Sequence, residues 1–297
     1  MSWFVLSLIA ILFWSGSDLF SKMGSKPDDP YSHWKMVMAV GTVMGIHAIF
    51  MMVTGTPFEL MDIVRYLPAS LLYIFSMILG YAGLRYIELS VSSPICNSSG
   101  AVAALLCFIF LKETMSGLQF FAVALVCIAV FLLAVLEKRQ NDAELALSGE
   151  KVDAKYRKSA LAVLLPIFYC ILDGLGTFTD AFLLDVVIAE DQANIAYELT
   201  FLLMAIFAFI YVVLIKKAKF EIPRERPKVI AALFETAGQF AYVYAIGANA
   251  IVAAPMISAY CIVSLLWGRI FLKEKLSKAQ YAVIALAAIG IIILGQE

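Results

Sequence analysis

The sequence predicts an all-α integral membrane protein in which ten transmembrane helices form two inverted five-helix repeats. The composition, the apolar stretches and an internal repeat support this fold class. Of the 297 residues, 63% are hydrophobic and 15% are charged, and the mean hydropathy is +0.91. Soluble domains contain about 45–50% apolar and about 25% charged residues. The composition therefore excludes an ordinary soluble enzyme, a disordered chain and a nucleic-acid-binding protein.

Apolar stretches of membrane-spanning length follow one another along the whole chain. A helix needs about 20 apolar residues to cross a hydrocarbon core of about 30 Å. Glycines, prolines and charged clusters separate the stretches, so each is expected to be one helix. We read the first as a membrane span, since it lacks the basic start and the cleavage site of a signal peptide. The predicted helices are 2–22, 34–54, 67–87, 91–111, 116–136, 159–183, 195–215, 228–247, 250–271 and 278–295.

A repeated motif indicates that the chain arose by duplication. The segment IFLKETMSGLQ, which begins at Ile109, agrees at seven of eleven positions with IFLKEKLSKAQ, which begins at Ile270. The same offset of 161 residues aligns Pro94 with Pro255. Because polar positions agree and keep their order in both halves, a real duplication explains the match better than chance among apolar helices.

The two repeats are expected to enter the membrane from opposite faces. Each holds five helices, an odd number, and such inverted repeats are found in many secondary transporters. Alternate connections between helices, beginning with the first, hold 20 of the 22 Lys and Arg residues when the flanking helix ends are included. Basic residues prefer the cytoplasmic side, so both termini are predicted to lie outside. The predicted domains are a first repeat at 1–137, a polar linker loop at 138–158 and a second repeat at 159–297.

Carboxylates inside the apolar stretches point to a polar cavity. A carboxylate in the middle of a bilayer costs about 2.5–3.5 kcal/mol on insertion scales, so it normally faces a cavity or a partner. Asp18, Asp173, Glu198 and Glu235 lie within predicted helices, whereas Asp180 is expected to be solvated at the membrane interface. Acids outnumber basic residues there, which favours cations or protons over phosphate ligands. The alternative is a carboxylate paired with a basic residue or a hydroxyl inside the bundle.

Aromatic and amide side chains accompany these acids. Trp14, Tyr81 and Tyr242 lie on helices that also carry polar residues. Aromatic faces beside carboxylates can hold an ammonium group, although aromatic residues are also common in membrane helices for packing alone. Gln239 lies four residues after Glu235 and three before Tyr242, so these three side chains share one face of a helix.

Several motifs together carry a family resemblance. They are FWSGSDLFSK at 13–22, the segments around Pro94 and Pro255, and FLKE at 110–113 and 271–274. With ten predicted helices in two halves, the chain resembles the drug/metabolite transporter superfamily, in the branch built from two EamA-type repeats. Many bacterial relatives have cytoplasmic termini, whereas the charges here predict the reverse.

The resemblance implies transport by alternating access around a central cavity lined by helices 1, 3, 4, 6, 8 and 9. The last helix of each half often mediates packing or dimer contacts in relatives, which makes a homodimer one expected arrangement. No cofactor is implied. The candidate substrate-binding residues are Trp14, Asp18, Tyr81, Asn97, Tyr169, Asp173, Glu235, Gln239, Tyr242 and Ser258.

The function that follows is a secondary transporter of a small organic solute such as an amine or an amino acid. We expect a multi-pass protein of a bacterial inner or plasma membrane, in contact with its solute and the lipid bilayer. Proton coupling through Asp173 or Glu235, uniport and exchange all stay open. A sugar-phosphate or nucleotide-sugar exchanger is the alternative within the superfamily. Phosphate sites normally use Lys or Arg, and only Arg85 and Arg269 keep that alternative open.

An intramembrane enzyme is the alternative from another class. The stretch LDGLGTFTD at 172–180 holds two acids, but it lacks the further residues of a phosphotransferase motif. No HExxH or GxSG motif occurs, so we expect no catalytic residue and no metal site. The five cysteines lie in apolar runs without a CxxC pair, and Gly41 and Gly45 form a GxxxG pattern; both features are typical of helix packing.

Overall fold

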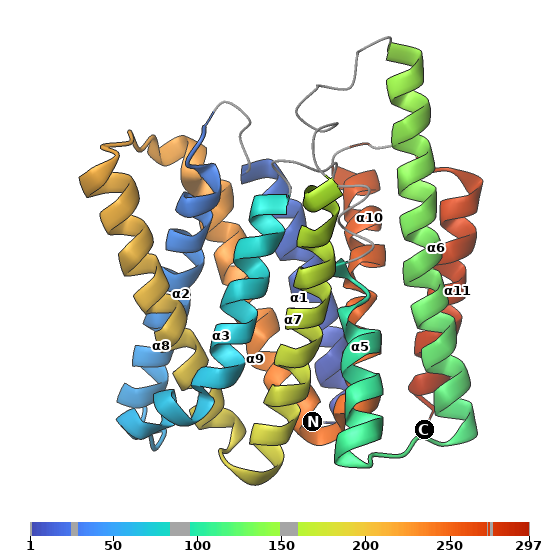
Figure 1. Ribbon diagram of the computed structural model, residues 1–297, viewed down its shortest axis with the longest axis horizontal. Coiled ribbons are helices and arrows are strands. Elements are labelled where there is room, and N and C mark those ends of the chain that lie inside the picture. Colours follow the sequence, from blue (N-terminus) through green and yellow to red (C-terminus); the bar gives the residue numbers. More distant parts are fainter. Residues whose placement is uncertain are drawn as a thin grey trace. The chain divides into compact units, whose positions relative to one another are not determined.

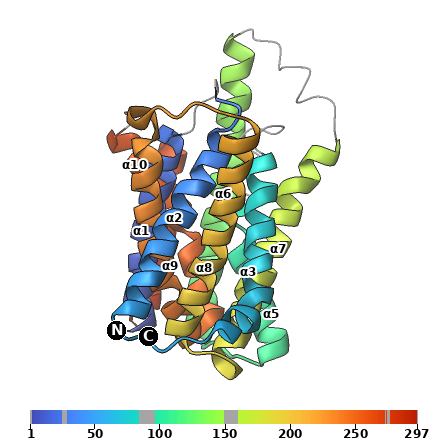
Figure 2. The same ribbon diagram turned by 90° about the vertical axis from the view of Figure 1, so that its left-hand side faces the viewer.

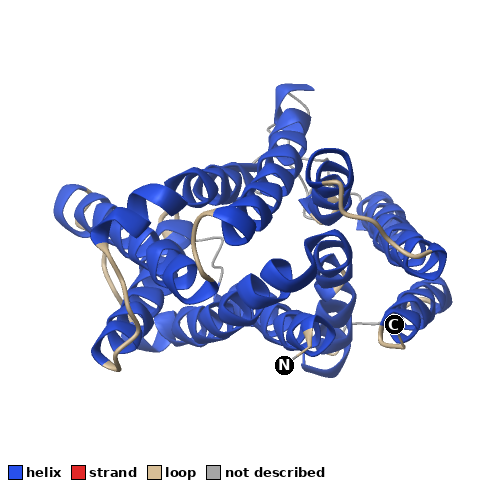
Figure 3. Cartoon of the chain, turned by 90° about the horizontal axis from the view of Figure 1, so that it is seen from below, coloured by secondary structure: helices blue, strands red, loops and turns tan. Residues whose placement is uncertain are grey.

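The chain is helical throughout the part that the structure describes (Figures 1 and 3). The computed structural model describes residues 2–24, 29–83, 96–148, 160–271, 273 and 276–296, and these contain no strand. The predicted all-α class is therefore confirmed for these residues. The elements are α1 (Trp3–Gly24), α2 (Ser32–Val53), α3 (Leu60–Gly83), α5 (Ser99–Leu106), η1 (Cys107–Leu111), α6 (Gly117–Ser148), α7 (Ala160–Val186), α8 (Glu190–Phe209), η2 (Ile210–Ile215), α9 (Ile222–Ser258), α10 (Tyr260–Phe271) and α11 (Lys278–Leu294).

Six helices in the described part of the chain are long and apolar enough to cross a membrane. They span Trp3–Gly24, Ser32–Val53, Leu60–Met77, Ile167–Val186, Glu190–Ile215 and Ile222–Phe271. Shorter apolar helices cover Ser99–Leu111, Gly117–Leu133 and Lys278–Leu294. The number of ten helices and their inverted arrangement stay predictions, because residues 84–95 lie outside the described part.

Several helix boundaries differ from the sequence prediction; α3, for example, begins at Leu60 where the prediction began at residue 67. Helix α6 continues to Ser148, so residues 138–148 of the predicted linker loop are helical. Good helix formers such as Glu, Lys, Arg, Ala and Leu fill that stretch, which explains why the helix runs beyond the apolar part. Helix α9 joins two predicted helices, with a single non-helical residue, Asn249, between them.

The two FLKE motifs have the same local conformation where it can be compared. Lys112 follows the end of η1 with φ 56°, and Lys273 lies just beyond α10 with φ 58°. A left-handed residue after the last helical turn is a common way to end a helix, although it is usually a glycine. The repeated motif thus ends a helix in each half.

The chain forms two compact units, which we describe separately. Unit 1 comprises Met1–Ser70, Thr179–Ala248 and Val263–Leu272. Unit 2 comprises Leu71–Phe178, Asn249–Ile262 and Lys273–Glu297.

Unit 1 is built around the close packing of α2 on α8 (Figures 1 and 2). A Cβ atom at Gly41 would lie 2.2 Å from the backbone oxygen of Phe201. A Cβ atom at Gly45 would lie 2.7 Å from the side chain of Leu202. Only glycines allow this approach, so the packing role predicted for the GxxxG pattern is confirmed.

An ion pair joins the same two helices. His47 Nδ1 of α2 lies 2.7 and 2.9 Å from the two carboxylate oxygens of Glu198 in α8. The Glu198 side chain is completely buried, whereas that of His47 is 31% exposed. The ring of Phe240 in α9 packs edge-on against the imidazole, with 5.6 Å between ring centroids. The pair supplies the partner that a carboxylate inside an apolar helix needs.

Unit 2 contains the packed pair α6 and α11, which lie side by side in Figure 1. A Cβ atom at Gly290 would lie 3.0 Å from the backbone oxygen of Ala122, so this contact also depends on a glycine. The part of α9 that follows the non-helical residue Asn249 also makes a hydrogen bond within unit 2. The backbone N–H of Ile251 donates to Glu113 of the first FLKE motif, with 3.1 Å between nitrogen and oxygen.

Replacing Gly41 by alanine tests the α2–α8 packing. The added methyl group would collide with the backbone of α8, and we expect Gly41→Ala to lower the free energy of unfolding by about 1–3 kcal/mol. Gly117→Ala is the matched control, because no described atom lies within 4 Å of its Cβ position. Thermal unfolding in detergent measures both, and equal stability of the two variants would contradict the packing model.

The ion pair makes an asymmetric prediction. His47→Phe leaves Glu198 buried without its partner, and we expect a loss of about 3–5 kcal/mol in unfolding free energy. Glu198→Leu should cost less, because the partly exposed imidazole can remain neutral. The double variant should be more stable than His47→Phe alone, since both polar groups are then gone. Chemical unfolding of the three variants checks this order, and additive losses would argue against the pair.

Candidate functional site

The structure distributes the predicted site residues over the two units. Unit 1 holds Trp14, Asp18, Glu235, Gln239 and Tyr242, and unit 2 holds Asn97, Tyr169, Asp173 and Ser258. Tyr81 belongs to α3, but its side chain lies outside the described part, as do Arg85 and Pro94 entirely. Each group can therefore be examined within its own unit.

In unit 1, aromatic side chains fill a close contact between α1 and α9. The indole ring of Trp14 stacks on the ring of Tyr242 with 4.9 Å between centroids and 34° between planes. A Cβ atom at Gly238 would lie 2.4 Å from the indole, so a glycine is required for Trp14 to lie across α9. On the other helix, Gly16 makes the same allowance for Phe234. The structure thus brings together two of the predicted aromatic residues, and it adds two glycines that the sequence analysis did not single out.

The acids of this group differ in their partners. Glu235 of α9 accepts a hydrogen bond from the Ser17 hydroxyl of α1, and it interacts electrostatically with the carboxylate of Asp18. The Asp18 carboxylate lies 3.8 Å from the Lys22 ammonium, one turn further along α1, and its side chain is about one-third exposed. Glu235 is therefore the acid of this group that a hydroxyl holds, whereas Asp18 already has a cationic neighbour.

Gln239 lies one turn after Glu235 and is only 3% exposed. Its amide nitrogen has no hydrogen-bond partner among the described residues. A buried amide donor without a partner costs about 1–3 kcal/mol, so a ligand or a water molecule that accepts its proton would be favourable. This side chain shares a helix face with Glu235, as the spacing predicted.

In unit 2, hydroxyl groups surround Asp173. Its carboxylate accepts a hydrogen bond from Ser99 at the start of α5. It also lies 3.4 Å from the hydroxyl of Ser76 in α3, which has a nearer acceptor in the backbone oxygen of Tyr73, at 2.8 Å. One turn further along α7, the Thr177 hydroxyl lies 3.3 Å from the hydroxyl of Tyr73. The hydroxyl partner that the sequence analysis considered for these acids is therefore present, and it comes from another helix.

Other predicted residues of unit 2 have structural contacts. The Ser258 hydroxyl donates to the backbone oxygen of Ala254 at 3.1 Å, within its own helix. A Cβ atom at Gly100 would lie only 2.0 Å from this hydroxyl, so Ser258 faces the α5 backbone. Asn97 lies two residues before the start of α5 and is partly buried, as is Tyr169 in α7. Ser258 thus takes part in helix packing.

Two residues differ from their expected roles or were overlooked. Asp180 was expected to be solvated, but it is completely buried and accepts a hydrogen bond of 2.7 Å from the Tyr66 hydroxyl. The sequence shows no sign of this partner, which lies 114 residues away. His47, the partner of Glu198, was not singled out, because a lone histidine on an apolar helix carries no spacing signal.

The described side chains include no group of three or more His, Cys, Asp and Glu residues that could hold a metal ion. What they offer instead are carboxylate acceptors inside membrane helices. Glu235 lies on the helix that also carries Gln239 and Tyr242, and Asp173 lies near serine hydroxyls. Such groups recognise ammonium groups and other hydrogen-bond donors by charge attraction and by cation–π contact.

Comparison with known proteins adds family and fold. The model of the EamA-like transporter family matches residues 1–135 and 191–296. A crystal structure of a protein with 14% sequence identity superposes with a TM-score of 0.71, and the match covers 99% of this chain and 96% of that one. None of the curated proteins compared with the chain matches it. The structural likeness shows the fold, while the family match covers most of the chain. The chain therefore belongs to the EamA-like transporter family of the drug/metabolite transporter superfamily, and it is a multi-pass membrane transporter of a small molecule.

Proposed function

We propose that this transporter moves a small organic cation or zwitterion, such as an amine or an amino acid, by alternating access as a secondary transporter. The observation that carries the proposal is the set of partners of Asp173 and Glu235. Serine hydroxyls hold both carboxylates. A hydroxyl leaves the negative charge of a carboxylate uncompensated, so a cationic solute gains by binding there.

The surroundings of Glu235 suit an amine in particular. The stacked rings of Trp14 and Tyr242 lie on the two helices that also carry Ser17 and Glu235. Aromatic faces attract ammonium groups, and the attraction grows where water is excluded. The amide nitrogen of Gln239 adds a hydrogen-bond donor on the same helix face, which suits the carboxylate end of a zwitterion.

The phosphate-carrying alternative has less support among the described residues. A phosphate site needs Lys or Arg side chains that are free to contact the ligand. The buried basic side chains of the described part are Lys35 and Lys228, and Glu225 is an ion-pair partner of both. Arg269 is exposed, and Arg85 lies outside the described residues.

The remaining parts of the proposal follow from the sequence. We place the chain in a bacterial inner or plasma membrane, with two inverted repeats around the cavity and with a homodimer as one expected assembly. Either Asp173 or Glu235 can exchange a proton as well as bind a cation, since both are carboxylates inside membrane helices. Proton coupling is therefore the form of energy coupling to test first.

Transport measurements in proteoliposomes test the role of the two acids. A thermal-shift screen of amines, amino acids and sugar phosphates selects the solute, and its radiolabelled form is the probe. We expect Glu235→Gln and Asp173→Asn each to reduce uptake about tenfold to a hundredfold, because each removes one charge-assisted contact. Asp185→Asn, at an exposed position, is the matched control and should transport normally.

Unchanged uptake in both acid variants would reject the acidic site and leave the transporter family intact. A stabilising response to sugar phosphates alone would favour the exchanger. A pH gradient that drives uptake in the wild type but not in one acid variant would identify the proton-coupling carboxylate.

A further inference from the structure

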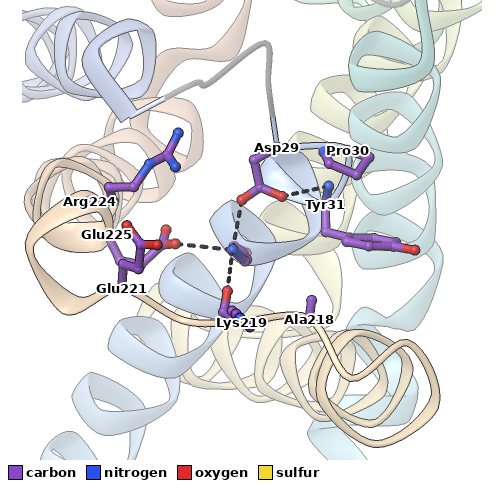
Figure 4. A pocket seen from close by; sticks show the side chains of 9 residues that line it. Asp29, Pro30, Tyr31, Ala218, Lys219, Glu221, Arg224 and Glu225 are labelled. Atoms are coloured by element: carbon purple, nitrogen blue, oxygen red, sulfur yellow. Dashed lines mark hydrogen bonds and ion pairs between the residues drawn. The ribbon is translucent and has the colours of Figure 1, made fainter.

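A pocket of about 250 Å³ lies in unit 1 beside the start of α2 (Figure 4). Its wall comes from segments far apart in the sequence. They are Asp29–Tyr31 before α2, Lys35 within α2, Ala218, Lys219 and Glu221 between η2 and α9, and Arg224 and Glu225 in the first turn of α9. Figure 4 labels Asp29, Lys219 and Glu225, whose oxygens are the three acceptors of the Lys35 ammonium. The pocket is separate from the acid sites described above.

The charges inside this pocket are balanced. Lys35 Nζ lies 2.7 Å from Asp29, 3.2 Å from Glu225 and 2.9 Å from the backbone oxygen of Lys219. Lys228, which is 2% exposed, lies 2.7 Å from the other oxygen of Glu225. Burial opposes ionisation of Asp29, but hydrogen bonds from Lys35 and the Tyr31 N–H outweigh it and hold the Asp29 pKa below its usual value. Two buried cations thus neutralise two acids, and Lys35 has no N–H left for a ligand.

An excess of positive charge remains on the segment between η2 and α9. Apart from the paired Glu225, residues 216–226 hold one acid, Glu221, and five basic side chains. Four of the five are exposed, and the fifth, Arg224, lines the pocket. The five are Lys216, Lys217, Lys219, Arg224 and Arg226.

Exposed apolar side chains lie between these basic residues. Phe220 is 43% exposed and Ile222 is 77% exposed. The Lys35 ammonium lies 4.9 Å from the centroid of the Phe220 ring, which fixes the ring beside the pocket. The segment directly follows the membrane-crossing stretch Glu190–Ile215. Apolar and basic side chains that alternate just beyond a membrane helix suit the headgroup layer, where one kind enters the acyl boundary and the other reaches the phosphates.

We propose that residues 216–226 and the pocket beside Lys35 bind the phosphate of an anionic phospholipid at the membrane surface. The exposed side chains of Lys216, Lys217, Lys219 and Arg226 supply the charges, and Lys219 also lines the pocket. Basic residues follow from membrane orientation alone. The pocket and the exposed pair Phe220 and Ile222 go beyond what orientation requires. The site is independent of the transported solute.

Lipid titration of the purified full chain in detergent tests the proposal. The probes are short-chain phosphatidylglycerol, short-chain phosphatidylcholine and inorganic phosphate, and the readouts are the unfolding temperature and the lipid retained in native mass spectrometry. We expect phosphatidylglycerol to raise the unfolding temperature more than phosphatidylcholine does. The double variant Lys219→Gln/Arg224→Gln should bind phosphatidylglycerol roughly thirtyfold more weakly. Each basic residue near a lipid surface raises the binding affinity about fivefold, and the two losses multiply.

A matched control separates this site from general electrostatics. Arg139→Gln/Lys278→Gln removes the same charge from exposed positions in unit 2 and should bind phosphatidylglycerol normally. Lys217→Gln/Arg226→Gln, at exposed positions of the segment, should weaken binding even if the pocket variant folds poorly. Equal effects of the two lipids, equal losses in the control variant, or the same stabilisation by inorganic phosphate would each overturn the proposal.

Discussion

A hydrocarbon layer offers no hydrogen-bond partner, so an acid inside a membrane helix normally pairs within the protein or faces a cavity. Four acids within the helices of this chain have partners on other helices. Glu198 takes His47, Asp180 takes Tyr66, Asp173 takes Ser99 and Glu235 takes Ser17. Each pair selects which helices become neighbours. The kind of partner also decides what the acid can do, since a hydroxyl leaves the charge available and a cation does not.

Small residues allow these pairs to form. A hydrogen bond between side chains on two helices requires the backbones to come close, and membrane helices achieve this with glycine. Gly41 and Gly45 bring α2 against α8, the two helices that share the His47–Glu198 pair. Gly16 and Gly238 do the same for α1 and α9, the helices that share Ser17 and Glu235. Polar partners and glycines therefore act together. The partners determine which helices pair, and the glycines let the two backbones come close enough for the hydrogen bond to form.

The helical class could be predicted from the sequence because its apolar stretches have the length of about 20 residues that a membrane-spanning helix requires. Helix ends were less predictable, since α6 continues past its apolar part on helix propensity alone. Partners of buried acids were beyond reach: Tyr66 and Asp180 are separated by 114 residues, and nothing local links them. The face shared by Glu235 and Gln239 was predictable because both lie on one helix. The roles of Asp173 and Glu235 in transport stay predictions.

Four helices pass from one compact unit to the other, and two of these crossings coincide with an irregularity. In α9 the division falls at Asn249, the single residue without helical geometry, and in α3 it falls two residues after Pro68. Missing backbone hydrogen bonds reduce the bending stiffness of a helix at such points. Within α9 the segment around Asn249 is therefore the easiest to bend, and within α3 it is the turn around Pro68.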